Sequence, residues 1–315
     1  MNLLKNLTKM STTTTSSEKC DVGLYGLAVM GQNFALNMAS HNFKVVVGNR
    51  SPSKVQVTVQ RAVDEGNLPL IGSSSPEDFV SKLQTPRKII LLVMAGKPVD
   101  DTIATLAEYL EPGDLIVDGG NEWYQNSTRR ALELEKRGIL FMGMGISGGE
   151  EGAREGPSLM PGSKRKAYDM MEPILLKCAA QVDDGACTGY IGPVGSGNYV
   201  KMVHNGIEYG DMQLIAEVYD VLRRIVGQSN EEMSRQFARW NEGVLSSYLI
   251  EITAKILNKA DDITGKGYVI DYVSLYNIYI FYSFRVDALF ITTIHQNRFL
   301  TLSNLFTTLL NPTDP

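Results

Sequence analysis

Apolar residues in the first two thirds of the chain come in short runs that alternate with amphipathic segments. The runs are rich in valine, isoleucine and leucine, as buried parallel strands are: CDVGLY, FKVVVGN, RKIILLVM, GDLIVDGG and ILFMGMGIS. Segments of helical periodicity lie between them, among them QNFALNMASHN and KPVDDTIATLAEYLEPG. Strands that alternate with helices of about ten or more residues indicate βαβ units. We therefore expect an α/β fold, a Rossmann-like doubly wound parallel sheet, over residues 20–194.

The alternation stops near Gly192, and the pattern from Gly195 to about Leu257 is helical throughout. The helical segments include EEMSRQFARWNEG and SSYLIEITAKILNK. We expect a domain boundary between Gly192 and Gly195, followed by a partial all-helical domain over residues 195–271.

Both ends of the chain differ in composition from the rest. Residues 1–19 are rich in serine and threonine and carry no acidic residue before Glu18. A disordered extension is the expectation there, and a short targeting peptide is the alternative. Residues 272–315 contain no glycine, although the chain has 29, and show no clear period. We expect them to form an atypical tail outside the pattern of the two domains.

Of the 315 residues, 43% are hydrophobic and 21% are charged, as in a soluble globular protein. The formal net charge of −5 argues against a nucleic-acid-binding protein, which would carry a basic surface. Three distant cysteines fit a reducing compartment such as the cytoplasm, and they form no metal-ligand pattern with the three histidines. Because no run of about 20 apolar residues occurs, we expect no membrane span.

A glycine-rich turn follows the first expected strand. GLAVMG, residues 26–31, is a GxAxxG variant of the dinucleotide fingerprint. Gly26 permits the tight turn, Ala28 replaces the glycine that approaches the pyrophosphate, and Gly31 allows close packing of helix and strand. The helix that follows would offer its N-terminal amides to the phosphates.

The end of the second strand, GNRSPSK, distinguishes between the two nicotinamide cofactors. An enzyme that uses NAD would carry an acidic residue there to bind the ribose hydroxyl. This chain has Asn49, Arg50 and Ser51, and a guanidinium suits the additional phosphate of NADP. Ser51 before Pro52 is also an ordinary helix N-cap, and both interpretations can hold together.

Two further motifs follow expected strands, at the edge where doubly wound sheets bind ligands. DGGN ends at Asn121, and GISGGEEGAREGPSLMPG contains Ser147, Gly148 and Gly149. The latter three residues could form an anion-binding nest of amides with a hydroxyl, and a flexible glycine loop is the alternative.

A polar stripe marks the helical segment GNYVKMVHNGIEYGDMQLIAEVYDVLRRIV. Its members fall at i, i+3, i+4, i+7 and i+8 and so share one face of a helix: Lys201, His204, Asn205, Glu208 and Tyr209. The stripe is either a site or a buried polar network in which every member is satisfied. As a site, it would use a lysine with a pKa lowered by partial burial as general base toward a substrate hydroxyl, with hydride leaving for the nicotinamide. A carboxylate two turns along, about 10 Å away, would handle a second proton.

These motifs together resemble the decarboxylating 6-phosphogluconate dehydrogenase family of the β-hydroxyacid dehydrogenases. The matching blocks are GLAVMGQN, NRS, DGGN, GISGGEEGAREGPSLMPG, VKMVHNGIEYGDMQLIAE and LSSYLIEIT, over about residues 20–271. The resemblance implies NADP-dependent oxidation of 6-phosphogluconate to a 3-keto acid, which loses carbon dioxide to give ribulose 5-phosphate in the pentose phosphate pathway. It also implies a homodimer that needs no metal.

The resemblance also implies roles for individual residues. Lys201 would be the base at the 3-hydroxyl and then the acid at decarboxylation, and Glu208 would protonate the enediol at C1. The residues that would hold the sugar acid are Asn121, Ser147, Gly148, Gly149, His204, Asn205 and Tyr209. Those that would bind NADP are Gly26, Leu27, Ala28, Val29, Met30, Gly31, Asn49, Arg50, Ser51, Val93, Met94, Ala95 and Asn121.

The chain departs from the family pattern at two points. Met94 stands where members carry a lysine beside the cofactor, in LVMAG for LVKAG, and Lys97 lies one turn out of place. After Asp271, members continue with KGTGKWT, a long helical domain and a tail that complete the phosphate site and most of the dimer interface. We hypothesise that residues 272–315 derive from a misread or retained non-coding segment, which a transcript with KGTGKWT in frame would support.

Three functions follow as hypotheses. The first is an active NADP-linked decarboxylating dehydrogenase. The second is a truncated dinucleotide-binding homologue, inactive or impaired because it lacks the phosphate ligands. The third is a related hydroxyacid dehydrogenase with an unphosphorylated substrate, against which NRS and HNGIEYGD argue.

Overall fold

The computed structural model describes residues 19–272. The chain divides into two compact units, Met1–Met202 and Val203–Pro315, and the division falls inside helix α8 (Ser196–Val221). The boundary suggested by the sequence, Gly192–Gly195, lies just before α8, whose first two turns belong with the first unit. The expected extension and tail lie outside the described residues, apart from Lys19 and Tyr272 at their inner ends.

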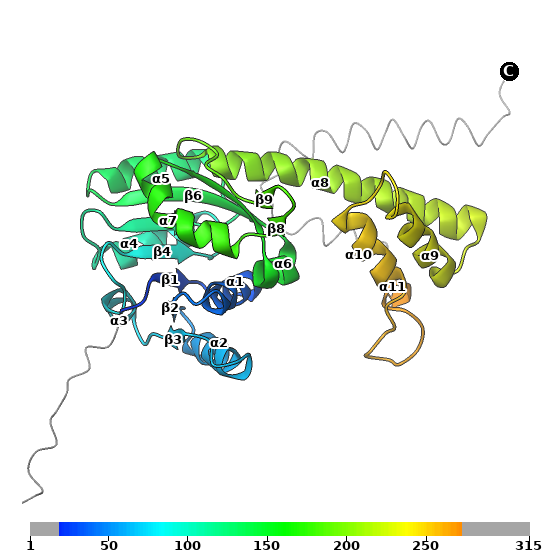
Figure 1. Cartoon of the computed structure of the whole chain (residues 1–315), viewed down its shortest axis with the longest axis horizontal. Helices are drawn as coiled ribbons and strands as arrows, with labels where there is room; N and C mark the ends of the chain where they lie inside the picture. Colours follow the sequence, from blue (N-terminus) through cyan, green and yellow to red (C-terminus); the bar gives the residue numbers. More distant parts are fainter. Residues whose placement is uncertain (1–18, 273–315) are drawn as a thin grey trace, which may run out of the picture. The chain divides into compact units, whose positions relative to one another are not determined.

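The first unit contains a seven-stranded sheet with strand order β3-β2-β1-β4-β5-β6-β7 (Figure 1). Its strands are β1 (Val22–Tyr25), β2 (Val45–Gly48), β3 (Leu70–Gly72), β4 (Lys88–Leu91), β5 (Leu115–Asp118), β6 (Leu140–Ser147) and β7 (Ser158–Ser163). Strands β1 to β6 pair in parallel, which confirms the doubly wound fold expected from the alternating pattern.

The edge strand β7 runs antiparallel to β6, with Ser147 paired to Ser158, and the sequence pattern did not predict it. Only the short helix α6 (Gly149–Glu155) separates the two strands. A parallel crossover needs about a dozen residues or more, so the chain reverses direction here instead.

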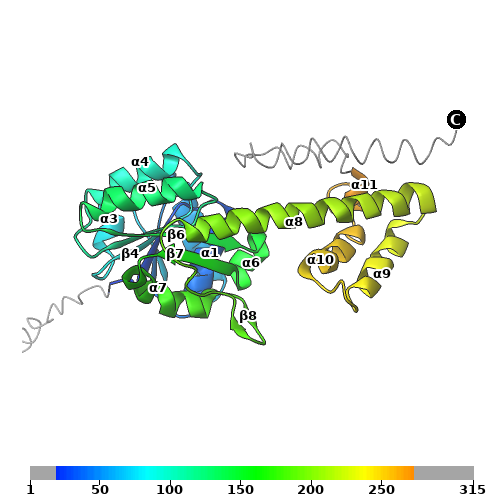
Figure 2. The same ribbon diagram turned by 90° about the horizontal axis from the view of Figure 1, so that it is seen from above.

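Strict alternation along the strands divides the apolar side chains between the two faces of the sheet. On β2, Val45 and Val47 face one core cluster, and Val46 faces the other. The first cluster includes α1 (Val29–Ser40), α2 (Pro52–Asp64) and α7 (Arg165–Cys178). The second includes α3 (Pro76–Ser81), α4 (Lys97–Ala107) and α5 (Tyr124–Glu135). Figure 2 shows the two helical layers on opposite sides of the strands. A small hairpin, β8 (Gln181–Val182) and β9 (Gly185–Ala186), follows α7.

The described part of the second unit, residues 203–272, is helical, as the sequence predicts. After α8 come the π-helical turn η1 (Leu222–Val226), α9 (Asn230–Trp240), α10 (Tyr248–Leu257) and α11 (Val269–Tyr272). Its core is formed by α9 and α10 through Met233, Phe237, Ala254 and Leu257. Across residues 19–272, no helix combines the length and apolarity that a membrane span requires.

Candidate active site

The turn between β1 and α1 can be built only with glycine at two positions. Gly26 has φ of +109°, and a Cβ there would lie 2.5 Å from the Leu92 carbonyl oxygen. A Cβ on Gly31 would lie 1.8 Å from the Gly26 carbonyl oxygen. Ala28 is the N-cap of α1 and supplies no side-chain cap, so this helix start presents backbone amides to whatever lies beyond it. Val29 and Met30 begin the helix, and the Leu27 side chain is buried in the core.

The β2–α2 loop is tied to this turn. The Leu27 N–H donates to Asn49 Oδ1 at 2.9 Å, and Asn49 Nδ2 donates to the Ser51 carbonyl at 3.2 Å. Arg50 and Ser51 are exposed at the start of α2, and Ser51 is the N-cap, as expected, although its hydroxyl makes no capping hydrogen bond. Burial raises the pKa of the Tyr25 phenol, and the nearby charge of Arg50 opposes that rise. Arg50 and Ser51 are thus consecutive exposed residues in a loop that is tied to the glycine turn through Asn49.

The loops after β4 and β5 lie against each other. Val93 is partly buried, Met94 is 61% exposed and Ala95 is exposed, so the two residues after Val93 project from the loop. A Cβ on Gly120 would approach the Val93 carbonyl oxygen to 3.4 Å, which shows how closely the loops pack. Asn121 follows Gly120 and is exposed. Burial raises the pKa of Asp118, at the end of β5, to about 7, although the Gly120 N–H and Arg130 act to lower it.

The segment after β6 is the start of a helix rather than an open loop. Ser147 ends the strand, and Gly148 and Gly149 both have positive φ, +142° and +61°. A Cβ on Gly148 would lie 2.9 Å from the Gly152 Cα, whereas one on Gly149 would meet nothing within 4 Å. The backbone of Gly149 therefore faces open space at the first residue of α6.

Lys201 is positioned by glycines in β6. A Cβ on Gly145 would lie 2.5 Å from the Lys201 Cβ, and a Cβ on Gly197 would lie 2.4 Å from the Gly143 carbonyl oxygen. The first turns of α8 therefore pack directly on the backbone of β6, and Lys201 is only 7% exposed. Gly143 and Gly145, which alternate with Met144 in β6, are the sequence signal for this contact, and Lys201 was predicted from helical spacing without it.

Asn198, which the sequence did not single out, is a further residue at the candidate site. Its side chain is 2% exposed, accepts from the Ser127 hydroxyl at 2.8 Å and donates to the Gly120 carbonyl at 3.3 Å. It lies one turn before Lys201 and bonds the residue that precedes Asn121. The structure thus brings the DGGN loop and the start of α8 together.

The five polar residues of the stripe all lie on α8, as their spacing predicts. In the second unit, His204 Nδ1 lies 3.2 Å from Asn205 Oδ1 and 3.7 Å from Glu208 Oε2. The side chains of His204 and Glu208 are 36% and 32% exposed, and Asn205 is buried. Tyr209 is half-buried. The described residues hold no group of three or more His, Cys, Asp or Glu side chains placed to bind a metal ion.

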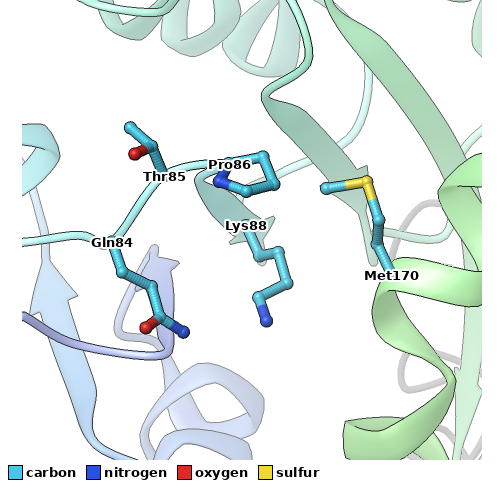
Figure 3. Close-up of a pocket in the computed structure, with 5 residues that line it drawn as sticks. All are labelled: Gln84, Thr85, Pro86, Lys88 and Met170. Atoms are coloured by element: carbon cyan, nitrogen blue, oxygen red, sulfur yellow. The ribbon is translucent and has the colours of Figure 1, made fainter.

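A pocket of about 140 Å³ lies at the opposite end of β4. Figure 3 shows the residues that line it: Gln84, Thr85, Pro86, Lys88 and Met170. Burial lowers the pKa of Lys88, and the charge of Asp21 opposes this. None of these residues is among those expected at the site, and doubly wound sheets bind ligands at the carboxyl ends of their strands instead.

Two family models match the chain. Residues 21–192 match the NAD binding domain of 6-phosphogluconate dehydrogenase, and residues 197–275 match the C-terminal domain of 6-phosphogluconate dehydrogenase. The chain is 61% identical over 252 residues to decarboxylating 6-phosphogluconate dehydrogenase 1 of Spinacia oleracea, covering 80% of this chain and 52% of the relative. It is 52% identical to the NADP(+)-dependent decarboxylating enzyme of Bacillus subtilis, covering 80% and 53%. The chain thus spans about half the length of the curated relatives it matches.

Solved structures agree with this similarity. The 6-phosphogluconate dehydrogenase of Plasmodium falciparum, solved in its apo form and in complexes with NADP+ and with 6-phosphogluconate, superposes with a TM-score of 0.74 at 52% identity. The match covers 81% of this chain and 54% of that one. The 3-hydroxyisobutyrate dehydrogenase of Salmonella typhimurium superposes with a TM-score of 0.60 at 18% identity, which shows a shared fold.

Proposed function

The chain belongs to the 6-phosphogluconate dehydrogenase family, and on that premise we propose that it catalyses the oxidative decarboxylation of 6-phospho-D-gluconate with NADP. The products are D-ribulose 5-phosphate, carbon dioxide and NADPH. The observation that supports this most is the placement of Lys201. It is a buried lysine on a helix packed against β6, and Asn198 joins that helix to the loop of Asn121 at the carboxyl ends of the strands.

Lys201 and Glu208 would divide the proton transfers between them. NADP, when bound, supplies the hydride acceptor. Lys201 would take the proton of the 3-hydroxyl as hydride leaves C3, and would return a proton to that oxygen as the carboxylate departs. Glu208, seven residues on and about 10 Å along the helix, would protonate C1 of the enediol. His204 lies 3.7 Å from Glu208 and would orient that carboxylate toward the substrate.

The cofactor would lie across the carboxyl ends of β1, β2 and β4. The N-terminal amides of α1, with Gly26 to Gly31, would hold the pyrophosphate. Arg50 and Ser51, beside Asn49, would bind the 2′-phosphate. Val93, Met94 and Ala95 would border the nicotinamide half, near Asn121. The sugar acid would be held by Ser147, Gly148, Gly149, Asn205 and Tyr209, together with Asn121 and His204.

The Arg50→Glu variant tests the cofactor assignment. A carboxylate in place of the guanidinium would repel the 2′-phosphate, so NADP affinity should fall by roughly 100-fold, about 2.7 kcal/mol, while NAD affinity changes little. Calorimetric titration of both dinucleotides into wild-type and variant protein measures the difference. Equal losses for the two dinucleotides would show that Arg50 does not contact the phosphate.

Turnover tests the activity itself. Purified chain with 6-phosphogluconate and NADP should produce NADPH and release carbon dioxide in equal amounts, and Lys201→Met should abolish both products while NADP still binds. NADP binding without turnover by the wild-type chain would support the second candidate, an inactive dinucleotide-binding homologue.

The assembly and compartment are also part of the proposal. A homodimer is supported by large apolar side chains exposed on α8, with Ile207 63% and Leu214 61% exposed. Sedimentation of the purified chain should give the mass of a dimer, and a monomer at all concentrations would exclude a dimer.

We propose a cytoplasmic location for the chain. Organellar import is the alternative, because two relatives from Arabidopsis thaliana are named chloroplastic. Imaging of the chain fused to a fluorescent protein separates the two.

A further inference from the structure

A buried guanidinium joins the loops that follow β4 and β5. Arg130 of α5 is 1% exposed. Its Nη1 donates to Glu122 Oε2 at 2.6 Å and to Asp118 Oδ2 at 3.2 Å, and its Nη2 donates to the Gly96 carbonyl at 2.9 Å. Its Nε donates to Asp100 Oδ1 at 2.7 Å. One side chain thus contacts the loop after β4, the loop after β5 and the first turn of α4.

Gly96 is held through both of its backbone polar groups. Its N–H donates to Glu122 Oε2 at 2.8 Å, and its carbonyl accepts from Arg130. Gly96 has φ of +84° and lacks a side chain that could anchor it, so these two bonds fix its position together with the Val99 N–H, which donates to the same carbonyl at 3.0 Å. Met94 and Ala95 immediately precede it, and their position follows from that of Gly96.

Glu122 holds the other loop in the same way. Its Oε1 accepts from the Trp123 N–H at 2.8 Å and from Asn126 Nδ2 at 3.0 Å, in addition to the bonds that Gly96 and Arg130 donate to its Oε2. Burial would raise the pKa of Glu122, but these hydrogen bonds outweigh burial and lower it. Glu122 therefore stays ionised and remains a strong acceptor next to Asn121.

Such a cluster is a poor way to gain stability alone. Taking a guanidinium and two carboxylates out of water costs several kcal/mol per ion, and apolar residues of similar volume would often stabilise the fold as well or better. The cluster does hold two loops in one geometry, because each bond is directional and the guanidinium has a fixed planar fork.

We infer that Arg130 is a positioning residue for the dinucleotide. It holds Val93–Gly96 against Asp118–Glu122, so that Met94 and Ala95 keep the nicotinamide half in register with Asn121. This inference rests on the proposed function for the identity of the ligand, and the loop coupling itself does not depend on it.

The chain offers a matched control in the adjacent arginine. Arg129 is 44% exposed and bonds Asp100 and Glu133, but it reaches neither Gly96 nor Glu122. Hydrogen exchange on the full chain compares wild type with Arg130→Met, Arg130→Lys and Arg129→Met. We expect faster exchange in residues 92–97 and 118–123 in Arg130→Met, a smaller increase in Arg130→Lys and no change in Arg129→Met.

Unchanged exchange in those two segments of a folded Arg130→Met protein would overturn the inference. If Arg130→Met does not fold, Arg130→Lys provides the same comparison, because an ammonium has three N–H donors and cannot replace all four contacts of Arg130, to Asp100, Asp118, Glu122 and the Gly96 carbonyl. Exchange as fast in Arg129→Met as in the Arg130 variant would also overturn it.

Binding measurements with two ligands test the functional part. NADP+ spans both halves of the cofactor, whereas adenosine 2′,5′-bisphosphate carries only the half that would meet Arg50. In Arg130→Met we expect NADP+ affinity to fall roughly tenfold, about 1.4 kcal/mol, while adenosine 2′,5′-bisphosphate affinity changes by less than about twofold. Equal losses for both ligands would refute positioning of the nicotinamide half. If wild type binds neither ligand, the proposed cofactor is wrong, and hydrogen exchange still decides the loop coupling.

Discussion

Replacing Gly145 by alanine adds one methyl group at the contact between β6 and α8. The new Cβ would lie 2.5 Å from the Lys201 Cβ, 3.1 Å from its Cγ and 3.2 Å from the Gly197 carbonyl oxygen. Carbon atoms in good contact are separated by about 3.5–4.0 Å, so the start of α8 must move away from the sheet by roughly 1 Å. Lys201 and Asn198 would move with it.

The expected cost has two parts. An added methyl group in a closely packed core typically costs about 1–3 kcal/mol, which lowers the melting temperature by roughly 2–4 °C per kcal/mol in a unit of this size. A shift of about 1 Å in a catalytic group costs on the order of 100-fold in rate. If the chain turns over 6-phosphogluconate, kcat should therefore fall about 100-fold, while NADP affinity stays near that of wild type.

The assay combines thermal unfolding, NADP titration and steady-state kinetics. Gly210→Ala is the matched control, because Gly210 lies on the same helix and a Cβ there would meet nothing within 4 Å. This control should stabilise the helix by up to about 1 kcal/mol. A Gly145→Ala protein with the melting temperature and the kcat of wild type would refute the reasoning.

Two further predictions concern stability. Ser229 caps α9 by accepting from the Glu232 N–H, whereas the Ser51 hydroxyl makes no capping bond at α2. Ser229→Ala should therefore lower the free energy of unfolding by about 1 kcal/mol, and Ser51→Ala should lower it by much less. Urea unfolding of both variants measures the two losses. Equal losses would contradict the capping geometry. The pKa of Asp118 is raised in the folded protein to about 7, so the native state binds its proton more tightly than the unfolded state. The stabilisation that the protonated Asp118 gives is complete below pH of about 4 and is lost as pH rises through about 7. Between pH of about 5 and 8 the free energy of unfolding should fall by on the order of 2–3 kcal/mol. The same urea measurement on Asp118→Asn should lack that decline, and an unchanged pH slope in the variant would show that another group causes it.

Several features of the site could be predicted because a single residue type or a single spacing is enough to indicate each of them. The turn at Gly26 needs positive φ and Gly31 tolerates no Cβ, so the glycine fingerprint marks the β1–α1 turn without any knowledge of the fold. The stripe that begins at Lys201 follows from helical spacing alone. Whether the stripe and the other residues named from the sequence bind substrate and cofactor stays a prediction.

Other features required contacts between residues far apart in the sequence. The sequence did not indicate β7, because Ser158–Ser163 lies in the glycine-rich segment expected to form a nest or a loop, and only its antiparallel pairing with β6 makes it a strand. Arg130 lies among other charged residues in the segment STRRALELEKRG, and only the folded structure shows that it is buried against Gly96, 34 residues away in the chain.

The amino-acid sequence by itself determined the alternation of helices with β1, β2, β4, β5 and β6, the glycine turn and the polar face of α8, but it indicated neither β3 nor β7. Each of these depends on backbone geometry within a few residues, which local periodicity and residue type express directly. Only the tertiary structure shows that α8 packs directly against Gly145. It also shows that Asn198 connects the helix of Lys201 to the DGGN loop and that Arg130 joins the loops after β4 and β5. The contact at Gly145 depends on close packing of a helix on a strand. The two polar contacts form because burial removes water from polar groups, which then bond protein groups far away in the sequence.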